Sequence, residues 1–197
     1  MAQYKDLFAI KHNDLRPSKG KILISEPFLQ EVFFQRAVVL LVEHGSNGSM
    51  GFVVNKRTEL ALNDFFPEFG RLLQIPIYLG GPVSSNHLFF IHSLPENIPD
   101  GLQISENLYF DGNFESVKSY LLQGNPAEGN IKFFLGYSGW TENQLHNEIA
   151  HDSWLVSHSS NKSILTADDE SYWVRVVKQL GSPYNAWTNY PKNPLMN

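Results

Sequence analysis

The sequence AVVLLV, residues 37–42, is the strongest strand signal in the chain. It is apolar without interruption and rich in β-branched valine, a pattern typical of a strand that is buried on both faces. The loop HGSNGSMG at 44–51 follows, with Asn-Gly at 47–48, and then a second apolar run at 52–54. This arrangement predicts a β-hairpin. A phosphate-binding glycine loop needs a helix after it, so the hairpin is favoured over a nucleotide site.

Outward from this hairpin, short apolar runs and helical periodicities predict the remaining elements. Strands are expected at 22–24, 75–79, 87–91, 131–135 and 154–156, and helices at 114–122, 142–150 and 166–180. Weaker helical patterns lie at 4–12 and after Asn63. The last helix is expected to begin with a capping box of Thr166 and Asp169 and to stop at Gly181. Together these elements predict an α+β single domain, a mixed β-sheet flanked by helices.

The composition narrows the classes of function. The 197 residues are 42% hydrophobic and 18% charged, as in globular proteins, and they include no cysteine, which excludes disulfides, thiolate metal sites and cysteine nucleophiles. The net charge of -5 and the scattered basic residues predict no specific nucleic-acid partner. There is neither a signal-peptide pattern nor an apolar run of membrane-spanning length, so we expect a cytoplasmic protein without a membrane partner.

Several segments, in matching order and spacing, resemble the YqgE/AlgH family. They are GKILISEP at 20–27, FQRAVV at 34–39 with Glu-His at 43–44, GSMG at 48–51 with VNK at 54–56, LGGPV at 79–83, and LGYSGW at 135–140. The similarity spans residues 19–181. It implies an N-terminal extension at 1–18, a family domain at 19–181 and an irregular C-terminal tail at 182–197.

The resemblance implies a small bacterial cytoplasmic protein with a mixed α/β fold. The family has no established reaction or cofactor, and we therefore expect none here, although some members are named as transcriptional regulators. The chain departs from the family in its N-terminal extension and at Ala37, where members usually have serine after the arginine.

Residues 136–140, GYSGW, offer the one candidate nucleophile. A serine between glycines at a strand-to-helix turn is the pattern of the nucleophile elbow, but here the second glycine follows Ser138 one residue early. A hydrolase would also need one of five candidate histidines as its base, namely His87, His92, His146, His151 or His158. The competing interpretation is a helix entry, with Thr141 and Gln144 as a capping box and Trp140 packed on Leu145.

Two further patterns favour structural interpretations. His146 and His151 are five residues apart, which places them on different faces of a helix, so no metal site is predicted near Glu148 and Asp152. Gly80-Gly81-Pro82 follows a predicted strand and is interpreted as a plain turn in preference to a close approach of a ligand or another backbone.

Polar residues beside the apolar strands complete the candidate list. Arg36 is expected either to bind an anion or, preferably, to pair with Glu43 or another carboxylate. The residues assigned to a candidate ligand or partner site are Arg36, Glu43, His44, Asn55, Gly81, Pro82, Ser138 and Trp140.

The leading hypothesis is a non-enzymatic regulatory or interaction protein that acts through a protein partner or a small ligand. The first alternative is a hydrolase-like enzyme that uses Ser138 with a histidine. The second alternative, a DNA-binding transcriptional regulator, is opposed by the net charge of -5.

Overall fold

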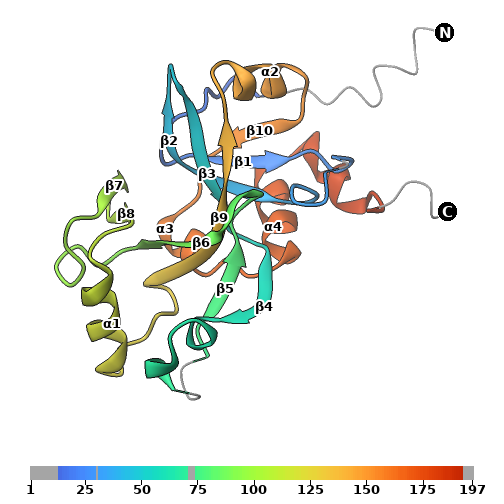
Figure 1. The fold of residues 1–197 in the computed structure, drawn as a ribbon. Helices are drawn as coiled ribbons and strands as arrows, with labels where there is room; N and C mark the ends of the chain where they lie inside the picture. The colour runs from blue at the N-terminus through green and yellow to red at the C-terminus, as the bar shows by residue number, and fades with distance from the viewer. Residues whose placement is uncertain (1–12, 30, 71–73, 193–197) are drawn as a thin grey trace, which may run out of the picture.

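The computed structural model describes residues 13–29, 31–70 and 74–192, and the predicted helical pattern at 4–12 lies outside them. Their strands form one sheet in the order β10-β1-β2-β3-β9-β6-β8-β7, to which β5 and β4 are joined through a pairing of β5 with β9 (Figure 1). The strands are β1 Ile22–Ser25, β2 Val38–Gly45, β3 Gly48–Val53, β4 Arg57–Ala61, β5 Pro76–Leu79, β6 Val83–His92, β7 Leu102–Ser105, β8 Leu108–Phe110, β9 Ile131–Trp140 and β10 Trp154–Ser157.

The predicted hairpin is confirmed. β2 and β3 pair antiparallel, with Val39 opposite Val53 and Leu40 opposite Phe52, and β2 lies between β1 and β3 inside the sheet. Alternate side chains of β2 enter different hydrophobic clusters: Leu40 packs with Trp173 of α4, and Leu41 packs with Leu145 of α2. Helices cover both faces here, which explains why the run at 37–42 is apolar throughout.

Four α-helices and three 3-10 helices occur in the described residues. They are α1 Phe114–Leu122, α2 Gln144–Ala150, α3 Asn161–Leu165, α4 Glu170–Leu180, η1 Leu62–Asp64, η2 Pro67–Phe69 and η3 Tyr184–Asn189. α1 begins at its predicted cap, since Asn113 accepts a hydrogen bond from the Ser116 backbone. Because β5 runs parallel to β9 and the other pairs are antiparallel, the predicted α+β domain with a mixed sheet is confirmed. None of the described helices is both long and apolar enough to cross a bilayer.

β9 is longer than predicted, and this changes the setting of Ser138. The strand continues past residue 135 to Trp140 and pairs with β3, β5 and β6 in the middle of the sheet (Figure 1). Residues 136–140 therefore lie within a strand and not at a strand-to-helix turn. The extension arises because β3 supplies backbone partners for residues 138–140, which local sequence patterns do not reveal.

Two local predictions at helix ends were wrong. The cap of α4 is Asp169, whose side chain accepts from the Ser171 backbone, while Thr166 ends the unpredicted helix α3. Asn63 lies inside η1 and does not cap it. The tail, expected to be irregular, forms η3, which packs on α4 through the buried Trp187.

Candidate functional site

Arg36 and Asn55 lie together at the start of β2. The buried Asn55 accepts from the Val38 backbone at 2.8 Å and donates to the Arg36 carbonyl at 3.0 Å. Arg36 donates to the Tyr190 carbonyl at 2.6 Å and lies 3.8 Å from the carboxylate of Glu170, so its partner is another carboxylate and not Glu43. These contacts connect the sheet to α4 and to the C-terminal segment.

Glu43 and His44 lie elsewhere, at the exposed end of the β2–β3 hairpin. His44 Nδ1 is 2.8 Å from the Ser49 hydroxyl on the opposite strand. A groove of about 610 Å³ runs between this hairpin and α2, and it includes His44, Ser49, Thr141 and His146. The structure thus separates Glu43 and His44 from Arg36 and Asn55.

Gly81 lies directly against the backbone of β9 at Tyr137 and Ser138. A Cβ on Gly81 would lie 2.3 Å from the Tyr137 carbonyl oxygen, so glycine is required for a close backbone approach and not merely for a turn. Ser138 is fully buried, and its hydroxyl donates to the Gly80 carbonyl at 3.0 Å. Pro82, the next residue after Gly81, is exposed.

Trp140 at the end of β9 is held by a carboxylate. Its indole N–H donates to Glu148 at 2.7 Å, and the Trp154 indole donates to the same oxygen at 2.8 Å. Of the predicted capping box, the Gln144 side chain accepts from the Thr141 backbone, while the residue at the cap position of α2 is Asn143. Trp140 and Leu145 share one cluster, as the predicted packing requires.

The eight predicted site residues therefore do not converge on one cavity. Each has a structural contact or an exposed position, and their assignment to a ligand or partner site stays a prediction. In the described residues, no group of three histidine, aspartate or glutamate side chains is placed to hold a metal ion.

A different set of residues surrounds a cavity of about 460 Å³ between β5, β9 and the segment linking α3 to α4. We name it the Lys132 cavity. Its polar lining residues are Arg57, Gln74, Tyr78, Glu128, Lys132, Thr166 and Asp168, and its apolar lining residues are Ile75, Pro76, Pro126, Ala127, Ile131 and Leu165.

Lys132 is the unusual residue of this cavity. It is only 2% exposed, and its ammonium group lies 3.3 Å from the centre of the Tyr78 ring and donates to the Ala167 carbonyl. The ring and the carbonyl favour the charged amine. Burial opposes it more strongly and lowers the pKa of Lys132 to about 7, even though Asp168 raises it.

Asp168 organises the polar side of the cavity. It accepts a hydrogen bond from the Tyr78 hydroxyl at 2.7 Å and forms an ion pair with Arg57 at 3.5 Å. Burial, followed by the bond to Asp168, raises the pKa of Tyr78, so the phenol stays protonated. The cavity thus brings an amine, a phenol, a guanidinium and a carboxylate together beside apolar residues, and polar groups placed in this way can orient a small molecule.

Comparison with known proteins places this architecture in a family. An AlgH-like family model matches residues 22–185, which is most of the chain. The chain belongs to the AlgH-like family. A UPF0301 protein of Parabacteroides distasonis is 59% identical over the full length of both chains, and one of Cytophaga hutchinsonii is 40% identical over 91% of this chain and 99% of its own.

Two solved structures share the AlgH-like fold. The solution structure of the AlgH protein from Pseudomonas aeruginosa has 25% identity and a TM-score of 0.69, and covers 91% of this chain and 98% of its own. A crystal structure of a protein from Corynebacterium diphtheriae has 20% identity and a TM-score of 0.70, over 92% and 96% of the two chains.

Sequence reasoning missed the Lys132 cavity in this AlgH-like chain. One signal was present, a lysine inside the apolar run IKFFL at 131–135. Side chains alternate along a strand, so Lys132 shares a face with Phe134 and opposes Ile131 and Phe133. Arg57, Tyr78 and Asp168 come from three distant segments, and nothing local in the sequence connects them to Lys132.

Proposed function

We propose that this AlgH-like chain is a non-enzymatic regulatory protein that binds a small polar organic molecule in the Lys132 cavity. The observation that carries the proposal is the convergence of Lys132, Tyr78, Asp168 and Arg57 on one cavity with apolar walls. Such a cavity can orient a ligand by hydrogen bonds while apolar contacts supply much of the binding energy.

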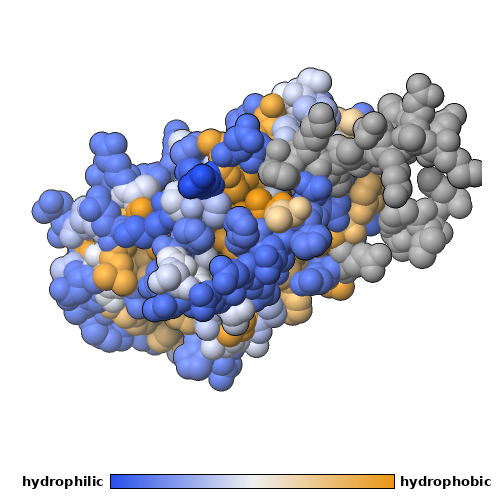
Figure 2. Space-filling model, turned by 90° about the horizontal axis from the view of Figure 1, so that it is seen from above, coloured by the Kyte–Doolittle hydropathy of each residue, from blue (hydrophilic) through white to orange (hydrophobic). Residues whose placement is uncertain are grey.

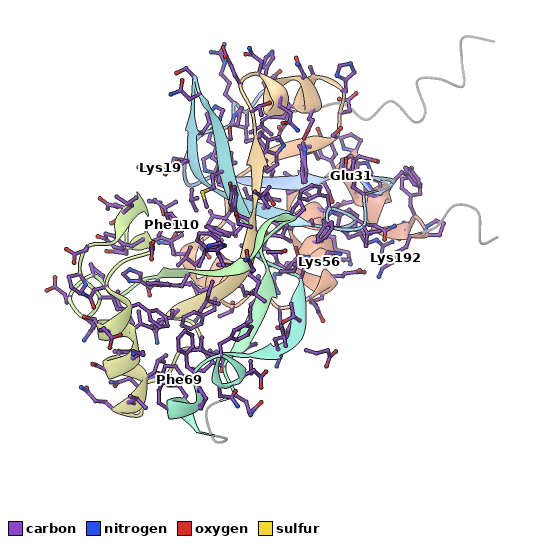
Figure 3. The ribbon with its side chains drawn as sticks, in the orientation of Figure 1. Lys19, Glu31, Lys56, Phe69, Phe110 and Lys192 are labelled. Carbon is purple, nitrogen blue, oxygen red and sulfur yellow. The ribbon has the colours of Figure 1, made fainter. Side chains whose placement is uncertain are left out.

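The position of Asp168 supports a regulatory output. Asp168 directly precedes Asp169, which caps α4 and whose backbone carbonyl accepts from Asn55. A ligand that competes for the Asp168 carboxylate would act on the first turn of α4. There Glu170 contacts Arg36, Lys56 and Lys192, and Figure 3 shows Lys56 and Lys192 on the same side of the molecule.

The geometry gives less support to a hydrolase. Ser138 is fully buried within β9 and already donates to the Gly80 carbonyl. A nucleophilic serine needs a histidine within hydrogen-bond reach and room for the substrate. Among the described residues, Ser49 has its hydroxyl 2.8 Å from a histidine nitrogen, that of His44, at the exposed hairpin end.

The test is a binding screen on the full chain with isotope-labelled backbone amides. Small amino acids, carboxylic acids, sugars and carbonyl compounds are added singly, and amide shifts are recorded. We expect at least one compound to shift the amides of Lys132, Ala167 and Asp168, and to raise the free energy of unfolding by about 2.7 kcal/mol at a hundredfold excess over its Kd.

Two variants test whether the ligand binds in the Lys132 cavity. Lys132→Met removes the amine and retains the chain length, so it should weaken binding. His146→Ala alters the groove beside the hairpin and should leave binding unchanged. A screen in which no compound shifts the cavity amides, or in which binding depends on His146 and not on Lys132, would refute the proposal.

A further inference from the structure

We propose that Lys132 captures a small aldehyde or ketone by forming a reversible imine with it. This inference rests on the proposed function, because it assigns the ligand of the Lys132 cavity to one chemical class. It adds a covalent step that a simple binding site does not need.

The first support is the placement of the amine. Lys132 is the second residue of β9; it pairs with Ile91 of β6, and the next residue, Phe133, pairs with both β5 and β6, so its backbone is held in the sheet. The side chain lines the cavity and is 2% exposed. A carbonyl compound in the cavity would therefore meet an amine at the end of a side chain anchored in a rigid strand.

The second support is the set of charges around the amine. The carboxylate of Asp168 is committed to the Tyr78 hydroxyl and to Arg57, and no described carboxylate lies within ion-pair distance of Lys132. Surface lysines differ: Lys118, for example, lies 2.8 Å from Glu115 and 3.7 Å from Glu68.

The third support is the protonation state of the Lys132 amine. Only the neutral amine attacks a carbonyl carbon, and a lysine in ordinary solvent is almost wholly protonated at neutral pH. Burial lowers the pKa of Lys132 to about 7, whereas the bond to Glu115 raises the pKa of Lys118. A large fraction of Lys132 is therefore neutral under conditions in which Lys118 is charged.

The step balances without an oxidant or a reductant. The nitrogen lone pair attacks the carbonyl carbon and forms a carbinolamine, and a proton moves from nitrogen to oxygen. A proton from solvent then joins the hydroxyl, the C–O bond breaks with release of water, and the nitrogen lone pair forms the iminium C=N bond. Loss of the second nitrogen proton to solvent gives the neutral imine and returns the proton that was used. Addition of water reverses every step, so capture is reversible, as a regulatory ligand requires.

Tyr78 and Arg57 have positioning roles in this proposal. The Tyr78 ring forms a wall against the amine, and its hydroxyl is directed to Asp168. Arg57, with a side chain about half exposed, lies at the open side of the cavity, where it can bind an acidic group on the carbonyl compound. The carbonyl carbon is thereby directed toward Lys132.

The experiment uses reductive trapping on the full chain. The protein is incubated near pH 7 with propanal and sodium cyanoborohydride, which converts an imine to a stable propyl-lysine, and each lysine is quantified by peptide mass spectrometry. We expect Lys132 to be propylated at least about tenfold faster than Lys118, because a larger fraction of Lys132 is present as the neutral amine. Similar rates at the two lysines would overturn the proposal.

Two variants check the assignment. Lys132→Arg keeps a cation and removes the reactive amine, so the fast site should vanish, while Lys118→Arg should leave the Lys132 rate unchanged. Circular dichroism confirms that each variant is folded. The wild-type ranking of lysines is decisive even when Lys132→Arg does not fold.

The amide-shift screen and the propylation rates together distinguish failure of the imine proposal from failure of the ligand-binding proposal. If compounds shift the cavity amides but Lys132 reacts no faster than Lys118, the imine is refuted and the ligand-binding function stands. If no compound shifts these amides and Lys132 is unreactive, both proposals fall. Fast propylation of Lys132 supports the imine and identifies propanal itself as a cavity ligand.

Discussion

A single buried histidine, His92, is expected to make the stability of this protein depend on pH. His92 at the end of β6 is fully buried, with Nε2 3.1 Å from the Asp111 carbonyl and Nδ1 accepting from the Leu94 backbone at 3.2 Å. This pair of partners places the proton of the neutral ring on Nε2. Burial, which outweighs the Asp111 carbonyl, lowers the pKa of His92 below 6.5.

The first prediction follows from the lowered pKa of His92. The unfolded chain binds a proton at His92 more readily than the folded chain, so the unfolding free energy falls as the pH drops below about 6.5 and levels off below the folded pKa. His92→Gln should be less stable near pH 7.5 and should lose less stability between about pH 7.5 and pH 5.5. Urea titrations at the two pH values measure this difference.

The exposed His146 supplies the control for His92. His146→Gln should keep the wild-type dependence of unfolding free energy on pH, since that side chain lies on the solvent side of α2. If the His92 and His146 variants retain equal pH dependence, His92 is not the group responsible.

Among the strands, the close packing of β9 against the Gly80-Gly81 segment is the most demanding contact. Gly81→Ala would place its Cβ 2.3 Å from the Tyr137 carbonyl oxygen, so the strands must separate. We expect a loss of at least about 3 kcal/mol in unfolding free energy, at the upper end of overpacking costs. Gly45→Ala, where no atom lies within 4 Å of the new Cβ, should cost less than about 1 kcal/mol. Equal denaturant midpoints for the two variants would contradict this account.

A third prediction distinguishes the two possible caps of α4. Asp169 accepts from the Ser171 backbone at 2.8 Å, whereas the Thr166 hydroxyl donates to the Lys162 carbonyl in α3. Asp169→Ala should therefore cost about 1 kcal/mol, and Asp169→Asn should cost less because asparagine also caps helices well. Thermal unfolding of these variants beside Thr166→Ala tests the assignment, which fails if Thr166→Ala is the costlier alanine substitution.

The charge of the whole molecule leads to the fourth prediction. Arg36, Lys56 and Lys192, three of the basic side chains, gather around the carboxylate of Glu170. Hydrophilic residues cover most of the face in Figure 2 and surround smaller hydrophobic areas. With a net charge of -5, we expect no sequence-specific binding of duplex DNA at physiological salt.

Fluorescence anisotropy with a pool of random duplexes, followed by selection, measures this directly. Any weak binding should be independent of sequence and should disappear as salt rises. Recovery of one duplex with a Kd of about 10 nM would contradict the prediction and revive the transcriptional regulator.

Local patterns were sufficient to predict most elements of the fold. The hairpin of β2 and β3 follows from an apolar run, an Asn-Gly loop and a second apolar run, all within 37–54. α1 follows from its cap and its periodicity. These signals are available in the sequence because turn geometry and side-chain periodicity depend on neighbouring residues.

The Lys132 cavity was decided by the tertiary structure alone. Four of its polar residues, Arg57, Tyr78, Lys132 and Asp168, come from β4, β5, β9 and the segment before α4, and they meet where β5 runs parallel to β9 beside the α3–α4 link. The pairing of β9 with β3 likewise turned an expected helix entry at Ser138 into a buried strand. Such long-range contacts depend on which strands become neighbours, and the burial that results lowers the pKa of Lys132 to about 7, below that of an ordinary surface lysine.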